Sequence, residues 1–377
     1  MKFAKRFASI ADPTVSNLLK LTETPGIISF AGGTPSPDAL PYKIIKKILP
    51  ELEIDLQYTP TQGIKSLREK IAKVYSDKWG IKITPDQILI TSGSQQALDL
   101  IAKVFLDGKD RVFVENPTYF VALYAFNAYG PEYQAFSAEK VLGEEKLSGK
   151  LMYLVSNFQN PTGKTISEVR RRNIAKAVIS NGLVLIEDDP YGELFFTDNP
   201  SKPIMLSAPE NTIYLTSVSK IMGPALRLGI VISTPETIQA LTRAKTGMDL
   251  CTSGLLQQLA GKILADPGYQ DHLTGMRKFY AKKCQAMLSE LKNRMPDGVV
   301  WSKPEGGLFI WMELPTKIDT SVLYRQALAK GVAFVPGYIF SPTGGLNNCL
   351  RLSFALPSLP EIRTGLTILS NLIKSNL

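Results

Sequence analysis

Short apolar runs alternate with longer amphipathic segments through the middle of the chain. From about residue 85, apolar runs of strand length occur at 88–90, 112–114, 151–155, 183–186, 213–215 and 226–232. Most of the segments between these runs have the spacing of apolar residues that a helix shows. Strands that are almost entirely apolar are buried on both faces, as in a parallel sheet. The pattern therefore predicts an α/β fold in which a mostly parallel sheet lies between two layers of helices.

The pattern changes beyond residue 267. A long charged segment at 269–294 has helical spacing, and shorter strand-like and helical segments follow it up to a last helix at 359–374. This mixture predicts a smaller α+β domain, which we expect the N-terminal residues to join. We place the large domain at 45–270 and build the small domain from 1–44 and 271–377.

Composition and charge exclude several classes of protein. No apolar run reaches the ~20 residues of a membrane span. None follows the basic N-terminus as a signal peptide requires, so we expect a cytoplasmic protein with no membrane partner. The net charge is +9, but the basic residues are dispersed. We interpret the densest cluster, at 170–172, as a solvated helix face, and we expect no nucleic-acid partner.

Histidine and cysteine are scarce. His272 is the only histidine, and we expect it on the surface. Unless His272 serves them, mechanisms with a catalytic histidine and histidine-based metal sites are excluded. The three cysteines, Cys251, Cys284 and Cys349, are too far apart in the sequence for a metal-ligand pattern. We therefore expect no bound metal.

Lys220 lies between two strand-like runs. It follows the run at 213–215, and the run at 226–232 starts six residues after it. The amine of a lysine held in such a place can form a Schiff base with an aldehyde. Nearby Ser217 and Arg227 carry groups that bind phosphate. Because pyridoxal 5'-phosphate is an aldehyde that carries a phosphate, this spacing indicates pyridoxal 5'-phosphate as a cofactor.

Polar residues follow the first two runs of the predicted sheet. Ligands of α/β sheets bind beyond the carboxyl ends of the strands, so these positions are candidates for a site. After 88–90, a turn with Gly93 and Ser94 opens a helix, whose free N–H groups suit a phosphate, although an ordinary N-cap has the same composition. After 112–114, Tyr119 suits stacking on a flat heteroaromatic ligand, and a core position suits it equally well.

Three further polar positions stand out. Asn160 begins the Asn-Pro-Thr-Gly stretch, which is also typical of a β-turn. The three carboxylates at 187–189 end a buried run, where charged groups are costly unless a cation lies beside them. A protonated pyridine nitrogen would serve as that cation. The alternative is a helix cap or a metal site. The planar fork of Arg351, within a strand-like run, suits a substrate carboxylate, with a surface position as the alternative.

These motifs resemble those of fold-type I, class I/II pyridoxal-phosphate-dependent aminotransferases, in the branch that contains 2-aminoadipate, kynurenine and aromatic aminotransferases. The resemblance covers about 30–354. Its most specific element is Ser-x-x-Lys at 217–220, with an arginine seven residues beyond the lysine. It implies the three-layer α/β/α large domain and the smaller α+β domain of that fold, pyridoxal 5'-phosphate as cofactor, and a homodimer.

The resemblance also implies roles for single residues. The catalytic residues would be Lys220, which binds the cofactor and moves the proton, Asp188, which pairs with the pyridine nitrogen, and Tyr119, which stacks on the ring. The other cofactor contacts would come from Ser94, Gln95, Asn160, Tyr191, Ser217 and Arg227, with Tyr58 reaching the phosphate of the partner subunit. Arg351, Gly33 and Asn160 would bind the substrate.

The implied reaction is a ping-pong transfer of an amino group from an L-amino acid to a 2-oxo acid such as 2-oxoglutarate. Relatives that take long dicarboxylates often carry an arginine where Ser16 stands, so an aromatic or aliphatic donor is favoured over 2-aminoadipate. One alternative is a lyase or decarboxylase on the same fold. A second is the ligand-sensing domain of a transcription regulator, but the motifs begin near residue 30 and we expect no DNA-binding module.

Overall fold

The computed structural model describes residues 2–4, 6, 20, 25–137, 146–197 and 201–377. A sheet of seven strands lies at its centre, in the order β2-β8-β7-β6-β5-β3-β4. These strands are β2 (Ile88–Thr91), β3 (Arg111–Glu115), β4 (Glu132–Phe136), β5 (Leu151–Val155), β6 (Val184–Asp188), β7 (Thr212–Ser217) and β8 (Gly229–Ile232). Within this sheet, β8 runs antiparallel to β2 and β7, and the other described pairs are parallel. The predicted mostly parallel sheet is confirmed.

Two strands differ from the prediction. The run at 226–232 becomes a strand only from Gly229, because Leu226 ends a short turn and Arg227 adopts a left-handed conformation with φ 47°. β4 was not predicted, since Glu132–Phe136 is a half-exposed edge strand without a continuous apolar run. A search for continuous apolar runs finds fully buried strands and misses a half-exposed edge strand.

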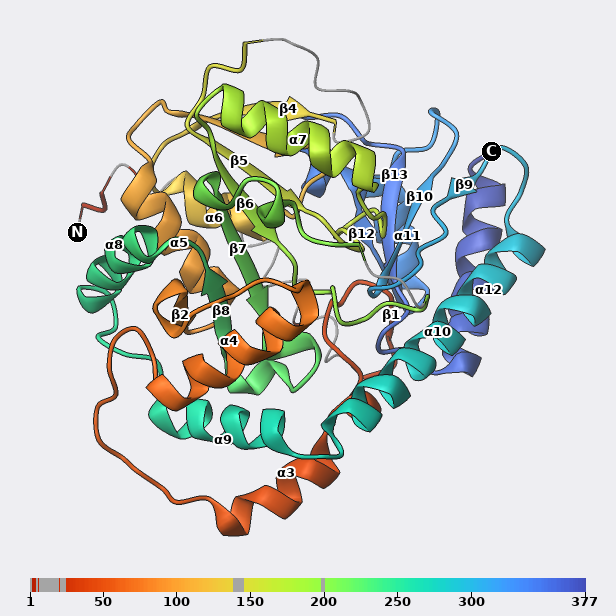
Figure 1. Cartoon of the computed structure of the whole chain (residues 1–377). Coiled ribbons are helices and arrows are strands. Elements are labelled where there is room, and N and C mark those ends of the chain that lie inside the picture. Colours follow the sequence, from red (N-terminus) through yellow and green to blue (C-terminus); the bar gives the residue numbers. More distant parts are fainter. Residues whose placement is uncertain (1, 5, 7–19, 21–24, 138–145, 198–200) are drawn as a thin grey trace.

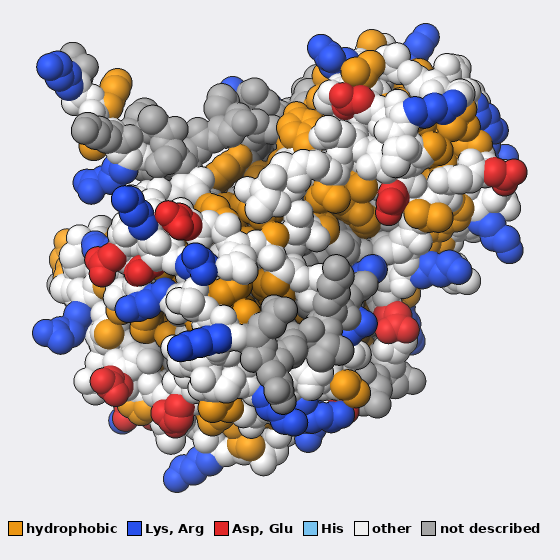
Figure 2. Space-filling model, turned by 90° about the horizontal axis from the view of Figure 1, so that it is seen from above, with side chains coloured by type: hydrophobic (Ala, Val, Ile, Leu, Met, Phe, Trp, Pro, Cys, Tyr) orange, Lys and Arg blue, Asp and Glu red, His pale blue; other side chains and the backbone are white. Residues whose placement is uncertain are grey.

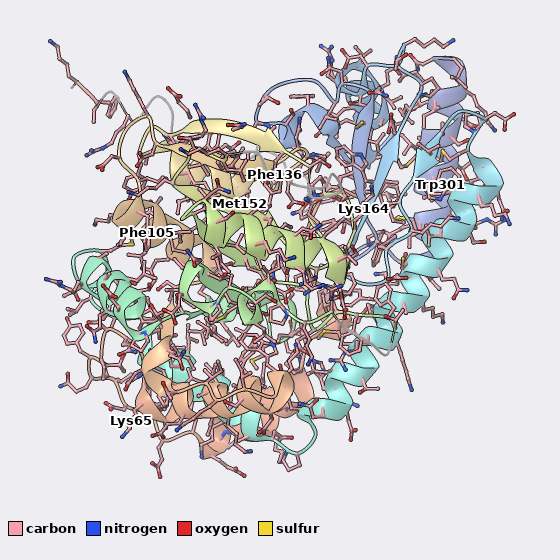
Figure 3. All side chains as sticks on the ribbon, turned by 45° about the horizontal axis from the view of Figure 1, so that its top comes forward. Lys65, Phe105, Phe136, Met152, Lys164 and Trp301 are labelled. Carbon is pink, nitrogen blue, oxygen red and sulfur yellow. The ribbon has the colours of Figure 1, made fainter. Side chains whose placement is uncertain are left out.

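Helices cover both faces of the sheet (Figure 1). Successive side chains of a strand point to opposite faces. On β5, Tyr153 packs on the side of α5 (Ser94–Phe105). Met152 packs on the other side, beside α7 (Glu168–Ser180), as Figure 3 shows. The layer of α5 also holds α6 (Phe120–Asn127) and α8 (Pro235–Thr246), and the layer of α7 holds α4 (Lys65–Trp79) and α9 (Gly254–Ala265). The predicted three layers are therefore present.

The C-terminal part forms a smaller α+β unit beside the sheet, drawn in blue in Figure 1. Its four strands are antiparallel, in the order β12-β13-β10-β9. They are β9 (Val300–Trp301), β10 (Phe309–Glu313), β12 (Val335–Pro336) and β13 (Cys349–Ser353), and the helices with them are α10 (Tyr269–Arg294), α11 (Thr320–Ala329) and α12 (Leu359–Ser375). The predicted change in the hydrophobic pattern beyond residue 267 corresponds to this unit.

The N-terminal segment is hydrogen-bonded to the C-terminal unit. β1 (Ile28–Ser29) pairs in parallel with β11 (Val332–Ala333). Directly after β1, the N–H of Phe30 donates to the carbonyl of Ala333 at 2.7 Å, and the N–H of Ser353 donates to the carbonyl of Phe30 at 2.8 Å. These bonds attach residues 28–30 to the C-terminal unit, and the division into domains stays a prediction.

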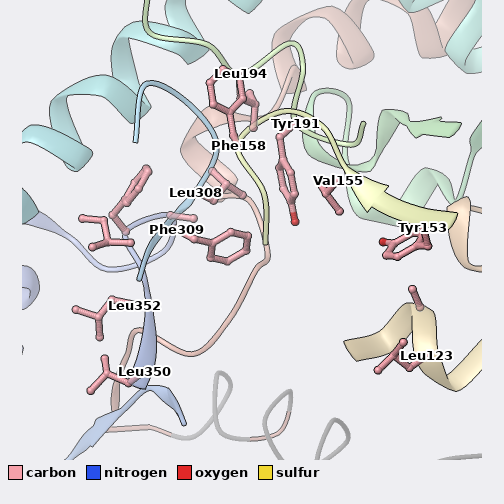
Figure 4. Close-up of a cluster of buried hydrophobic side chains, with 14 of the residues drawn as sticks. Leu123, Tyr153, Val155, Phe158, Tyr191, Leu194, Leu308, Phe309, Leu350 and Leu352 are labelled. Carbon is pink, nitrogen blue, oxygen red and sulfur yellow. The ribbon is translucent and has the colours of Figure 1, made fainter. Parts of the chain in front are cut away.

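A hydrophobic cluster joins the two sheets. Figure 4 shows Tyr191 between Phe309 of β10 and Val155 of β5. The rings of Tyr191 and Phe309 meet edge to face, with their centroids 5.7 Å apart. Burial of each such side chain stabilises the fold by about 1.5–3 kcal/mol. The contact therefore fixes the small unit against the carboxyl end of β5.

The basic cluster at 170–172 is not the solvated face that the sequence suggested. Arg172 is exposed, but Arg171 is buried and forms an ion pair with Glu187 at 3.4 Å. Glu187 also accepts hydrogen bonds from the backbone N–H groups of Ile204 and Met205, both at 2.9 Å. A buried carboxylate needs such partners, so one arginine of the cluster turns inward. The prediction was wrong for Arg171.

His272 is half-buried in α10 rather than plainly on the surface, so this prediction was also wrong. Its ring stacks on Tyr269, with centroids 6.4 Å apart, and burial lowers its pKa. Figure 2 shows lysine, arginine and acidic side chains dispersed over one face of the molecule. Among the described helices, none has the length and apolar character needed to cross a membrane.

Candidate active site

Most of the predicted site residues surround one cavity of about 290 Å³, beyond the carboxyl ends of the central strands. Eleven of the twelve line it: Gly33, Ser94, Gln95, Tyr119, Asn160, Asp188, Tyr191, Ser217, Lys220, Arg227 and Arg351. The exception is Tyr58, which is 80% exposed and lies away from the cavity of its own chain. The position of Ser16 falls outside the described residues.

One corner of the cavity suits an anion. Gly93, with φ 82°, precedes the first turn of α5, whose leading N–H groups lack intrahelical partners. A Cβ on Gly93 would lie 2.5 Å from the guanidinium of Arg227, so glycine lets that cation sit against the helix start. These donors form a site of the kind that binds phosphate. Ser217 lines the same cavity, and its hydroxyl donates to Ser219 Oγ at 2.9 Å.

Gln95 lines this corner, but its side chain is engaged elsewhere. The Nε2 of Gln95 donates to the backbone carbonyl of Val121 at 2.9 Å. This bond ties α5 to α6 just after Tyr119, the residue that caps α6 and faces the cavity. Gln95 therefore offers an anion its backbone N–H rather than its amide.

Lys220 ends the short turn that follows β7. Its Nζ donates to the carbonyl of Gly33 at 3.0 Å. The pKa of Lys220 is lowered to about 8, mainly by burial and also by the charges of Arg351 and Arg227, while Asp188 acts in the opposite direction. Near neutral pH a part of the population thus has the uncharged amine, which is the nucleophilic form.

Asp188 is 2% exposed at the end of β6. The Tyr153 hydroxyl donates to its Oδ2 at 2.9 Å, whereas its Oδ1 has no hydrogen-bond partner among the described residues. The pKa of Asp188 is raised to about 7: burial is the main cause and Asp189 adds to it, while the Tyr153 hydrogen bond and the charge of Lys220 act in the opposite direction. A buried carboxylate oxygen without a partner is costly, and a protonated ring nitrogen would meet its need.

The three carboxylates of the 187–189 run have separate roles. Glu187 accepts the first N–H groups of the turn Ile204–Leu206, so the helix-cap interpretation applies to this residue. Asp189 accepts hydrogen bonds from Asn157 at 3.0 Å and from the Tyr214 hydroxyl at 2.9 Å. Of the three, Asp188 is the one that lines the cavity.

Arg351 is buried on β13, and the surface interpretation is wrong for it. Its guanidinium donates to Asn160 Oδ1 at 2.7 Å and to the carbonyl of Ala31. The rings of Phe309 and Phe340 lie on it, with centroids 4.3 Å and 5.1 Å from its central carbon. This packing holds a cation at the cavity wall, where a carboxylate can pair with it.

Asn160 fits both interpretations that the sequence allowed. It begins a turn, closed by the N–H of Gly163 donating to the carbonyl of Gln159, and it lines the cavity. A Cβ on Gly163 would lie 2.5 Å from the carbonyl oxygen of Phe309, so this turn packs closely on β10. The turn thereby carries Asn160 to Arg351.

Sequence reasoning missed Tyr153, Phe309 and Phe340, which support Asp188 and Arg351. One signal was present for Tyr153. It lies within an apolar run, and a hydroxyl in a strand buried on both faces must find a partner. The two phenylalanines offered no such signal, because an aromatic residue in a small-domain strand is ordinary core.

The profile of the family "Aminotransferase class I and II" matches residues 31–369, and the chain belongs to this family. Aromatic-amino-acid aminotransferase 1 of Thermococcus litoralis is 39% identical over 395 residues, covering 100% of this chain and 94% of the relative. The 2-aminoadipate transaminase of Thermus thermophilus is 40% identical over 391 residues, covering 99% of this chain and 96% of the relative.

A solved structure of Pyrococcus horikoshii kynurenine aminotransferase, in complex with PMP, superimposes with a TM-score of 0.94 at 39% identity. The match covers 100% of this chain and 97% of that one. The predicted family, fold class and aminotransferase activity are therefore confirmed, and the chain is an aminotransferase.

Proposed function

We propose that this aminotransferase holds pyridoxal 5'-phosphate in the cavity and moves an amino group from an aromatic or aliphatic L-amino acid to a 2-oxo acid such as 2-oxoglutarate. The observation that carries the proposal is the pairing, in one cavity, of the Lys220 amine with the unpartnered Asp188 Oδ1. The PMP bound in the similar Pyrococcus structure supports the choice of cofactor.

The residues around the cavity fit this cofactor. The start of α5, with Ser94 and Gln95, would hold the phosphate together with Ser217 and Arg227. Asp188 Oδ1 would accept the proton of the ring nitrogen. Tyr119 would stack on the ring, and Asn160 and Tyr191 would bind its oxygen. When bound, the cofactor supplies an aldehyde that takes up the amino group and a ring that withdraws electrons from the substrate.

We assign the other steps of the reaction to side chains around the cavity. The uncharged amine of Lys220 removes the proton from the substrate's Cα and returns a proton during the transfer. The carboxylate of Asp188 would keep the ring nitrogen protonated, because a buried negative charge favours a protonated partner beside it. Arg351 holds the substrate's carboxylate and so fixes the direction of its Cα–H bond. Gly33 would let the substrate approach the backbone closely.

We further propose a homodimer in which Tyr58 reaches the phosphate in the partner's cavity. Tyr58 is 80% exposed and does not line the cavity of its own chain. It lies in an exposed apolar stretch, where Ile54 and Leu56 are 64% and 85% exposed. Exposed apolar residues of this density are typical of a surface that another chain covers.

Replacing Arg351 by methionine should lower kcat/KM for both amino acid and 2-oxo acid by about 10²-fold, since misplacement by ~1 Å costs that much. The loss should fall mainly on substrates that carry an α-carboxylate. Amino-acid amides, which lack this charge, should react about equally with both proteins. Steady-state kinetics with matched acid and amide donors measure this difference, and Arg172→Met, which removes an exposed arginine, is the control. An equal loss for acids and amides would contradict the role of Arg351.

An amino-donor screen with 2-oxoglutarate tests the proposed reaction. Glutamate should form with aromatic and aliphatic donors, and 2-aminoadipate should be a poorer donor. A Ser16→Arg variant should improve 2-aminoadipate relative to the aromatic donors, because its cation can pair with the distal carboxylate. Each donor is also incubated without an acceptor. Pyruvate and ammonia in that arm, with no glutamate in the other, would favour the lyase alternative.

A further inference from the structure

A network of polar side chains lies behind the phosphate corner, outside the cavity lining. At its centre is Lys245 of α8, whose side chain is 0% exposed. Its Nζ lies 2.5 Å from Asp249 Oδ1 and 3.2 Å from Gln96 Oε1. Burial alone raises the pKa of Asp249, but hydrogen bonds from Lys245 and Gln96 outweigh this effect and lower it. The network therefore contains a charged carboxylate.

The network is attached to the turn that precedes Ser94. The backbone N–H of Ser92 donates to Gln96 Oε1 at 2.7 Å, and the Ser92 hydroxyl donates to Asp249 Oδ2 at 3.1 Å. Gln96 Nε2 also donates to Asp249 Oδ2 at 2.6 Å, which links the two acceptors of Ser92 to each other. Both the backbone and the side chain of Ser92 are thus fixed by groups that rest on the Lys245–Asp249 pair.

The position of this turn decides the geometry of the phosphate corner. Gly93 directly follows Ser92, and a Cβ on Gly93 would lie 2.5 Å from the guanidinium of Arg227. On the other side, a Cβ on Gly229 would lie 2.6 Å from the carbonyl carbon of Gly93. A shift of the turn would therefore move the helix start away from Arg227 or press it into β8.

The same network reaches the segment of Tyr58. Thr252 Oγ1 lies 3.4 Å from the Ser92 hydroxyl, and the carbonyl of Thr252 accepts from the Thr59 hydroxyl at 3.3 Å. Gln257 Nε2 donates to that carbonyl at 2.8 Å and contacts Thr59 Oγ1 at 3.4 Å. Thr59 follows Tyr58, so the phosphate turn and the Tyr58 segment share one support.

A buried lysine is costly unless it is paired, and an apolar side chain of similar size would fill the same space at less cost. We propose that Lys245 and Asp249 are positioning residues for the phosphate of the cofactor, holding the turn at 92–93 so that the start of α5 and Arg227 face the same anion. This inference rests on the proposed function of the cavity. Neither residue touches the cavity, so both act through Ser92 and Gln96.

The test compares two ligands that differ only in the phosphate. Dissociation constants for pyridoxamine 5'-phosphate and for pyridoxamine are measured by calorimetry on the full-length apoprotein, for wild type, Lys245→Met and Asp249→Asn. Both variants should bind pyridoxamine 5'-phosphate about 10-fold more weakly, the size of one lost charge-assisted hydrogen bond, with pyridoxamine affinity unchanged. With saturating cofactor, kcat should stay near that of wild type.

Lys73→Met is the matched control. Lys73 and Asp77 form an exposed pair of the same i,i+4 spacing, 2.9 Å apart, on α4. This variant should leave both dissociation constants unchanged. If Lys245→Met fails to fold, Asp249→Asn still tests the positioning role, because asparagine keeps the shape of the aspartate side chain.

The possible outcomes distinguish a failure of the positioning role from a failure of the proposed function. If the variants keep the wild-type preference for the phosphorylated ligand, or weaken both ligands equally, the positioning role is overturned and the proposed function stands. If the wild-type chain itself shows no preference for pyridoxamine 5'-phosphate over pyridoxamine, the proposed function of the cavity fails.

Discussion

Replacing Lys220 by alanine should abolish transamination, with a fall in kcat of at least about 10⁴-fold. The substitution removes the amine that binds the cofactor and the group that moves the proton, and proton transfer alone contributes about 10²–10⁴-fold. The other cations on the cavity wall, Arg227 and Arg351, cannot replace the Lys220 amine as a base, because arginine stays protonated. The phosphate corner remains intact, so the variant should still bind pyridoxamine 5'-phosphate.

Borohydride reduction followed by peptide mass spectrometry provides a second readout. In the wild-type chain, the added mass of the reduced cofactor should appear on the peptide that contains Lys220, and in Lys220→Ala it should be absent. Lys283→Met is the control, because burial also lowers the pKa of Lys283 to about 8, but this lysine donates to the carbonyl of Leu356 and does not line the cavity. Full activity in Lys220→Ala, or the mass on another lysine, would refute the assignment.

The composition of the site could be predicted because one simple rule governs its position. In parallel strands the carboxyl ends meet at one edge of the sheet, so polar residues after separate apolar runs converge. β5, β6 and β7 are neighbours in register, with Tyr153 opposite Ile186 and Ile186 opposite Ile213. Asp188 is the last residue of β6, Asn160 and Lys220 follow β5 and β7, and all three line the same cavity.

The features of the structure that could not be predicted depend on contacts between residues that are distant in the sequence. The buried state of Arg171 follows from Glu187, which lies on another element and needs a cation. Arg227 was assigned to a strand because its apolar neighbours continue the run, whereas its left-handed conformation depends on packing against Gly93. Lys245 looks like an ordinary surface residue of an amphipathic helix, and only the fold places it behind the phosphate turn. Local pattern contains none of this information.

Replacing Asp188 by asparagine should lower kcat/KM by about 10²–10³-fold, the cost of removing one electrostatic contact that stabilises charge in the transition state. A neutral amide cannot favour a protonated ring nitrogen, so electrons of the substrate's Cα have no strong acceptor. The Tyr153 hydroxyl can still donate to the asparagine oxygen, so the fold around it should be kept. Kinetics at saturating cofactor measure the loss, and Asp86→Asn, at an exposed carboxylate, is the control.

The same substitution should have the opposite effect on the stability of the apoprotein. Burial raises the pKa of Asp188 from 3.8 to about 7, so its charged form disfavours the folded state. The contribution of Asp188 to stability is therefore complete below about pH 4 and is lost as the pH rises through 7. Apo Asp188→Asn should consequently gain in Tm over apo wild type as the pH rises from 4 to 8, as measured by calorimetry across that range. A constant Tm difference would contradict the raised pKa. With cofactor bound the order should reverse, because the ring nitrogen then compensates the charge that asparagine lacks.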